Sequence, residues 1–322
     1  MRDPSTSSSI VSRRNAIAGL GAGALGLTLA AHRSIASAQD ATPAPPADEV
    51  LQLGDDTYAF VASGYVSLFV VTDDGVIATD PSGQFDTGRA DRYRAAIAEV
   101  TDQPVRYLVY SHSHPDHATG GDVFADTATF VSHRDAVAQI EALGDARTPV
   151  PTVAFDDFLS LELGGTVVEL HHAGRNHSDN SVVLLHPADR VLFAVDFIPV
   201  NSLPYQDLLY TYPEEWIASL RWIDEHLDFD TLVPGHPPLP GTKTNVGEVR
   251  GYLEDLIAAV RGAQAEGLAD GSAEMVEAVR AELEPAYGGW ANFEEWLPLN
   301  VEGLLRTWSE QGGTPASGTP EA

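Results

Sequence analysis

Three histidines and an aspartate fall within six residues, and this short run constrains the chain more than any other feature. The run begins at His112 and ends at His117, with His114 and Asp116 between them. It directly follows residues 105–110, an apolar stretch that predicts a buried strand. The end of a strand is rigid, and loops held by such ends often carry binding and catalytic residues. We therefore expect His112 and His114 to converge on one metal ion, with Asp116 and His117 turned toward a second.

Composition limits which atoms can hold these ions. The chain contains no cysteine, which excludes disulfides, a cysteine nucleophile and thiolate ligands. Any metal must then be held by imidazole and carboxylate groups. Such donors suit zinc and also admit iron or manganese.

The run resembles the H-x-H-x-D-H signature of the metallo-β-lactamase-like superfamily. The rest of that family's pattern follows over nearly all of residues 50–240. Its further motifs occur in the family's order: Asp80 at the end of an early strand, His177 in Gly174-Arg-Asn-His177-Ser-Asp-Asn, Asp196 at the end of strand 191–195, and His236 in Val-Pro-Gly-His236.

The resemblance implies a two-metal centre with defined roles. One ion would be held by His112, His114 and His177, and the other by Asp116, His117 and His236. Asp196 would bridge the two ions, and Asp80 would orient a ligand histidine without touching metal. Asp116 and Asp196 would be the catalytic carboxylates. The two divalent ions are expected to be zinc, with iron or manganese as alternatives.

The implied chemistry is hydrolysis of a carbonyl-type bond in an ester, a lactone, a thioester or a β-lactam amide. Two ions roughly 3.5–4 Å apart can share a hydroxide that attacks the carbonyl carbon. Two other functions stay open. One is a mononuclear iron dioxygenase that oxidises a sulfur compound, and the other is a metal-binding accessory protein without turnover.

The charge of the chain argues against nucleic acid as a partner. Lys and Arg number 18 against 47 Asp and Glu, a formal net charge of −29. Nucleic-acid binding needs clustered Lys and Arg, so we expect a small-molecule substrate instead. The segment after Asp196 contains Phe197, Leu203 and Tyr205, which we expect at an apolar pocket rim. Such a rim favours a neutral ester, lactone or amide over an anion.

Other polar residues are expected to play structural roles. This group consists of His133, His171, His172, His186 and Asn180, the last of which should bond to backbone near a turn. His226 lies on an amphipathic stretch and should be solvated.

The first 38 residues resemble a twin-arginine export signal. Arg13-Arg14 precedes the apolar run 16–31, and Ala36-Ser37-Ala38 forms an A-x-A cleavage signature. We therefore expect the chain to be exported to the periplasm, the cell envelope or the medium. Residues 39–48 and 312–322 read as a disordered linker and tail. No sustained apolar run follows residue 38, so the mature chain should not insert stably in a membrane.

Periodicity alone predicts a mixed α/β chain. Two β-rich halves, roughly 50–131 and 153–233, could form two sheets packed face to face with helices outside. That arrangement is the four-layer αβ/βα sandwich that the resemblance implies for a single domain over residues 49–311. Residues 246–311 read as mostly helical, and we expect them to pack on the outer layer rather than to cap the site.

Overall fold

The computed structural model describes residues 48–310. The predicted export signal, the tail 312–322 and all but the last residue of the linker 39–48 lie outside the described residues. Within residues 48–310, no helix is both long enough and apolar enough to cross a membrane.

The first sheet has seven strands that are hydrogen-bonded in chain order. Neighbouring strands pair antiparallel from the first to the fourth and parallel from the fourth to the seventh. The strands are β1 (Glu49–Gln52), β2 (Thr57–Ala62), β3 (Tyr65–Thr72), β4 (Gly75–Thr79), β5 (Val105–Val109), β6 (Thr129–His133) and β7 (Val153–Phe155). Ser63 and Gly64 both have positive φ, which matches the two-residue hairpin turn that joins β2 to β3.

The second sheet has six strands in the order β13-β12-β11-β10-β9-β8. Only β11 and β12 pair parallel in this sheet as the structure describes it. The strands are β8 (Phe158–Leu163), β9 (Thr166–His171), β10 (Val183–His186), β11 (Val191–Val195), β12 (Thr231–Pro234) and β13 (Gly241–Thr242).

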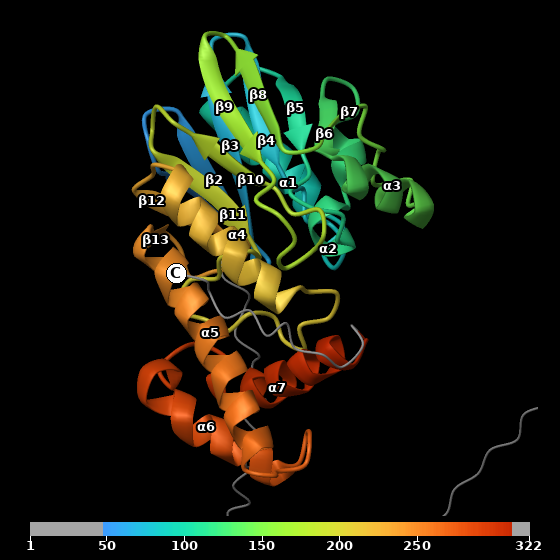
Figure 1. Ribbon diagram of the computed structural model, residues 1–322. Helices are drawn as coiled ribbons and strands as arrows, with labels where there is room; N and C mark the ends of the chain where they lie inside the picture. Colours follow the sequence, from blue (N-terminus) through green and yellow to red (C-terminus); the bar gives the residue numbers. More distant parts are fainter. Residues whose placement is uncertain (1–47, 311–322) are drawn as a thin grey trace, which may run out of the picture. The chain divides into compact units, whose positions relative to one another are not determined.

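Helices cover the outer face of each sheet (Figure 1). They are α1 (Arg89–Val100), α2 (Pro115–Ala118), α3 (Arg134–Leu143), α4 (Pro213–His226), α5 (Thr244–Ala265), α6 (Ala273–Tyr287) and α7 (Phe293–Glu310), with a 3₁₀ turn at Gly121–Phe124. Successive strand residues face opposite sides. In β4, Ile77 packs between the sheets while Val76 packs toward α1. In β11, Phe193 packs between the sheets while Leu192 packs toward α4. The predicted four-layer αβ/βα sandwich is confirmed.

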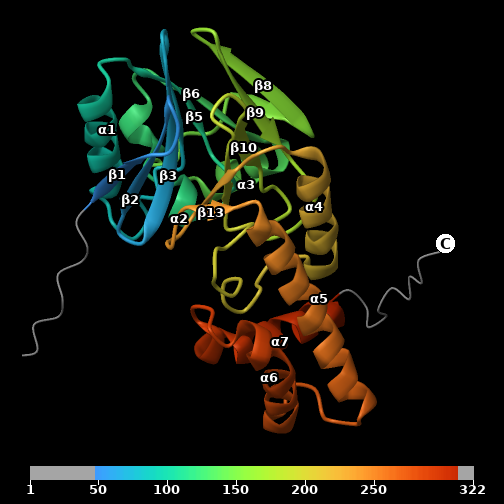
Figure 2. The same ribbon diagram turned by 90° about the vertical axis from the view of Figure 1, so that its left-hand side faces the viewer.

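The C-terminal helices form the largest apolar cluster together with the second sheet. Buried side chains of α4, α5, α6 and α7 all belong to this cluster. Both views show α5 leading from the second sheet to α6 and α7 (Figures 1 and 2). The helical prediction for 246–311 is therefore confirmed over the described residues.

The expected boundary between the two β-rich halves was wrong at residues 153–155. These residues form β7, which pairs parallel with β6 through Val131 and Val153 in the first sheet. The reason is that Phe155 buries its ring in the core between the sheets from the edge of the first sheet. The second sheet begins only at Phe158.

Candidate metal centre

The seven predicted ligands lie together at one edge of the two sheets. They are carried by segments that follow strands: His112, His114, Asp116 and His117 after β5, His177 between β9 and β10, Asp196 after β11, and His236 after β12. Because β11 and β12 run parallel, their carboxyl ends meet at the same edge and bring Asp196 and His236 together.

The ligand atoms form two groups. In each group, one nitrogen or oxygen atom per residue lies within 4.8 Å of the others. The first group consists of His112, His114 and His177, and the second of Asp116, His117, Asp196 and His236. The first group has the residues expected from the sequence, and the second has the expected three together with Asp196, which was expected to bridge the two.

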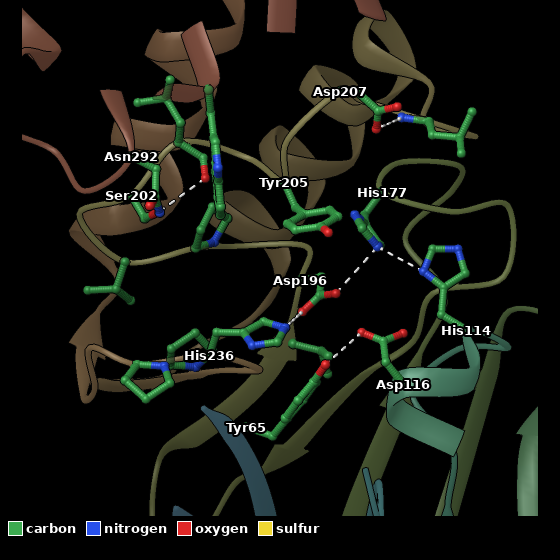
Figure 3. A pocket seen from close by; sticks show the side chains of 18 of the residues that line it. Tyr65, His114, Asp116, His177, Asp196, Ser202, Tyr205, Asp207, His236 and Asn292 are labelled. Atoms are coloured by element: carbon green, nitrogen blue, oxygen red, sulfur yellow. Dashed lines mark hydrogen bonds and ion pairs between the residues drawn. The ribbon is translucent and has the colours of Figure 1, made fainter. Parts of the chain in front are cut away.

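Asp196 stands between the two groups. Its Oδ2 lies 3.2 Å from Nε2 of His117 and 3.4 Å from Nε2 of His177. Its Oδ1 lies 3.3 Å from Nε2 of His236. Figure 3 shows this carboxylate between His177 and His236. A single carboxylate therefore faces imidazoles from both groups, which is the arrangement that a bridging ligand requires.

Hydrogen bonds on the far side of the rings fix how the imidazoles point. The hydroxyl of Ser111 donates to Oδ2 of Asp80 at 2.6 Å and lies 2.8 Å from Nδ1 of His112. Its single proton is thus engaged, so Nδ1 of His112 must be the donor and Nε2 keeps its lone pair toward the centre. Nδ1 of His236 donates to the Gly64 carbonyl at 2.8 Å.

The buried nitrogens fit a bound cation. Nε2 of His112 and Nε2 of His117 are buried and have no hydrogen-bond partner among the described residues. Leaving such groups unsatisfied costs about 1–3 kcal/mol each. Two inward-facing nitrogens that share one centre with carboxylates are instead typical of metal ligation.

Electrostatics at the centre follow from burial and from the carboxylates. Burial lowers the pKa of His112 and lowers that of His177 to about 3, so both imidazoles are neutral and free to ligate. Burial also opposes a charge on His117, but the carboxylates of Asp196 and Asp80 outweigh it and raise its pKa well above the usual value. A metal ion at this group must therefore replace a proton on His117.

The comparisons with known proteins agree with this geometry. The model of the metallo-beta-lactamase superfamily matches residues 62–236, more than half of the chain. The chain belongs to the metallo-β-lactamase superfamily.

Solved structures of the superfamily share the fold. The metallo-beta-lactamase from Pontibacter korlensis is 19% identical with a TM-score of 0.56, covering 65% of this chain and 99% of that one. TMB-1 is 18% identical with a TM-score of 0.55, covering 65% and 98%. At these identities the likeness concerns the fold alone.

Two curated relatives match over part of their length. The 2,4-dinitroanisole O-demethylase subunit alpha of Nocardioides sp. (strain JS1661) is 30% identical over 177 residues, covering 53% of this chain and 52% of the relative. The linear primary-alkylsulfatase of Pseudomonas sp. (strain ATCC 19151) is 24% identical over 263 residues, covering 65% and 49%. The chain thus spans about half the length of each relative.

Asp80 contacts the candidate metal centre from outside the two ligand groups. It is fully buried, accepts from the backbone N–H of Ser111 at 2.8 Å, and has Oδ2 3.3 Å from Nδ1 of His117. Loss of such a supporting group typically weakens metal binding or activity about 10–100-fold. We expect that loss for Asp80→Ala, measured by competition with a chelator. Asp122→Ala is the control, because Asp122 is exposed. If Asp80→Ala bound metal and turned over substrate as well as the unchanged protein, Asp80 would not support the ligands.

The other polar residues singled out from the sequence bond elsewhere. His133 stacks on His172 with ring centroids 4.1 Å apart. His186 lies 2.8 Å from the hydroxyl of Thr57. Asn180 is buried and accepts from the backbone N–H of Ser113 at 2.9 Å, which confirms the backbone-bonding prediction. His171 contacts Glu169, and His226 is exposed and stacks on Trp222.

A cavity of about 480 Å³ opens beside the metal centre. His114, Asp116, His177, Asp196 and His236 line its floor, and Figure 3 shows their side chains turned toward it. Leu203 and Tyr205 line the cavity as predicted. Phe197 was wrongly expected there: it is buried and packs toward Trp216 in the core, because the turn after Asp196 directs its side chain inward.

Several further residues line the cavity that could not be recognised from the sequence. Tyr65, the first residue of β3, has its hydroxyl 3.5 Å from Oδ2 of Asp116. Burial and Asp116 raise the pKa of Tyr65, so the hydroxyl stays protonated at neutral pH. Asn292 and Trp296 also line the cavity. The C-terminal helical region therefore reaches the site, which corrects the expectation that it only packs outside.

Proposed function

We propose that this chain is a dinuclear metal-dependent hydrolase that cleaves a carbonyl-type bond in a small molecule. The observation that carries the proposal is the position of Asp196, which has one oxygen within 3.4 Å of an imidazole nitrogen from each ligand group. The ions would be held by His112, His114 and His177 and by Asp116, His117 and His236, with Asp196 shared. Two divalent ions bound here would supply an activated water and polarise the bond being cleaved.

The surrounding side chains contribute positioning and proton transfer. Asp116 faces the cavity and lies 3.6 Å from Nε2 of His117, so its carboxylate can orient the attacking water and accept its proton. Tyr65 presents a protonated hydroxyl beside Asp116, from which it can donate to a substrate oxygen. Apolar side chains, among them Leu203 and Tyr205, line the cavity beside these groups.

The ester, lactone, thioester and β-lactam classes share this chemistry, and zinc is the ion we propose. The imidazole and carboxylate donors also admit iron or manganese. The two curated relatives are named as an O-demethylase and an alkylsulfatase. A primary alkyl sulfate and an aryl methyl ether therefore belong in the same substrate panel. Export through residues 1–38 stays a prediction from the sequence.

Metal removal tests the proposal directly. Treatment with a chelator should abolish hydrolysis, and two equivalents of zinc per chain should restore it, because both ligand groups must be filled. The measurement is metal content together with turnover of an aryl ester, a lactone, a thioester, a β-lactam, an alkyl sulfate and an aryl methyl ether. If the protein instead contains one iron per chain and consumes oxygen when a sulfur compound is added, its reaction is dioxygenation and not hydrolysis. A fully metal-loaded protein inactive on every compound would indicate an accessory protein.

A further inference from the structure

One wall of the cavity combines residues inside the superfamily match with residues from beyond it. The match to the superfamily ends at residue 236. Asn292 lies just before α7, and Trp296 lies within it. They meet the loop of residues 197–212 that follows Asp196 and lines the cavity with Leu203, Tyr205, Leu209 and Tyr210. Figure 3 shows Asn292 and Ser202 bonded to each other at this wall.

Hydrogen bonds from α7 hold this loop in place. Asn300 is fully buried and donates through Nδ2 to the carbonyls of Pro204 at 3.1 Å and Gln206 at 2.7 Å. A Cβ added to Gly303 would lie 1.9 Å from the Asp207 carbonyl, so the helix and loop are in direct backbone contact. α7 thus fixes the position of the cavity wall.

Backbone pairing before α7 continues the same contact. The N–H of Leu203 donates to the Ala291 carbonyl at 3.2 Å, and the N–H of Ala291 donates to Asn201 at 2.8 Å. The rings of Tyr205 and Trp296 pack edge to face with centroids 5.3 Å apart. The wall therefore presents a supported aromatic pair rather than isolated surface side chains.

The charged side chains that line the cavity wall disfavour an anionic group on the substrate. Among the described residues that line the cavity, none is Lys or Arg, whereas Asp207 stands in the wall. Asp207 is paired with Arg306 at 3.8 Å, and Arg306 does not line the cavity. A substrate carboxylate or sulfate along the wall would therefore meet a carboxylate and find no cation in the lining to bind it, which is unfavourable in a partly desolvated site. Aromatic rings and aliphatic side chains instead favour an uncharged ring.

We propose that α7 and the loop it holds select uncharged substrates with an aromatic group. The ring lies against Tyr205 and Trp296, and the bond to be cleaved faces Asp196. A cavity of about 480 Å³ accommodates a single ring with a short side chain. The orientation of the cleaved bond rests on the proposed hydrolase function, whereas the selection of the ring does not.

The test compares matched esters. Benzyl acetate is the uncharged aromatic substrate, 4-carboxybenzyl acetate adds a charge, and ethyl acetate lacks the ring. We expect kcat/KM for benzyl acetate to exceed that for the carboxylate by at least tenfold. Trp296→Ala should lower the ratio of kcat/KM for benzyl acetate to that for ethyl acetate about tenfold, mainly through KM. Tyr205→Ala, which changes an exposed side chain, should lower the same ratio by a similar factor. Trp308→Ala, on the same helix but away from the cavity, should leave the ratio unchanged.

Binding of uncleaved analogues separates this proposal from the hydrolase function. N-benzylacetamide should bind the purified protein at least tenfold more tightly than N-(4-carboxybenzyl)acetamide, measured by calorimetry, and Asp207→Asn should weaken this preference. If the amides bind in this way but no ester is cleaved, the proposed substrate selection by the cavity wall is supported and the proposed hydrolase function is contradicted. Cleavage of all three esters with similar kcat/KM, and equal binding of the two amides, would overturn the wall as a selector.

Discussion

Replacing Asp196 by alanine should lower hydrolysis by more than about 100-fold and remove one of the two ions. The expected loss exceeds the 10–100-fold typical for a residue that only supports a ligand, because Asp196 faces both ligand groups. Without it, the first group keeps its three imidazoles. The second keeps only Asp116, His117 and His236, so the second ion should dissociate preferentially.

The same change also alters the charge of the centre. The imidazoles of His117 and His236 outweigh burial and hold the pKa of Asp196 well below its usual range, so this carboxylate is ionised. Its negative charge lies where two cations would otherwise repel each other. Asp196→Asn keeps the shape of the side chain and removes that charge, and it should also lose the second ion.

Metal stoichiometry and turnover of the purified variants are the measurements. Asp228→Ala is the control, because this aspartate is exposed on the surface and pairs with Arg190. Two ions retained in Asp196→Ala, with hydrolysis near that of the parent, would mean that Asp196 is not the bridge. The two-metal reaction would then have to be rebuilt around Asp116 as the shared carboxylate.

The elements that carry the candidate ligands could be predicted because each depends on local sequence. A run of apolar residues predicts a buried strand, and the polar residue after the run marks the end of that strand. Asp80 follows β4, Asp196 follows β11, and His236 follows β12 after Gly235. Their meeting in space follows from the parallel pairing of β4 with β5 and of β11 with β12.

The direction of single side chains after a strand could not be predicted in the same way. Val195 has φ of 44°, which is unusual for a β-branched residue and bends the backbone sharply. The N–H of Phe197 closes this turn on the Ala194 carbonyl at 3.0 Å. The turn sends Phe197 into the core, although its apolar character alone suited a pocket rim equally well.

The cavity wall was missed because it depends on contacts between distant segments. Asn300 reaches the carbonyls of Pro204 and Gln206, which lie more than ninety positions earlier in the chain. Periodicity identifies α7 as an amphipathic helix but does not say which surface its apolar face will cover. The packing of α7 against this loop is therefore a property of the folded chain.

Replacing Arg89 by alanine should destabilise the fold by about 3–5 kcal/mol, because each buried acceptor left without a donor costs about 1–3 kcal/mol and the lost side chain leaves a cavity. The side chain is fully buried, yet burial lowers its pKa only to about 10, so it is charged at neutral pH. It donates to the carbonyls of Ala62 at 3.1 Å, Pro81 at 2.8 Å and Tyr65 at 3.1 Å. Alanine would leave these acceptors without a partner and open a cavity.

The position of Arg89 links this loss of stability to the metal centre. Its guanidinium ties the β2–β3 hairpin, whose Gly64 carbonyl holds His236, to the segment just after Asp80. Urea unfolding at fixed metal concentration measures the change, and Arg89→Ala should also bind metal less tightly. Arg92→Ala is the matched control on the same helix, since its partially exposed ion pairs with Asp48 and Asp86 are worth only about 0–1 kcal/mol. A loss for Arg89→Ala no larger than that for Arg92→Ala would show that the buried guanidinium does not hold the hairpin.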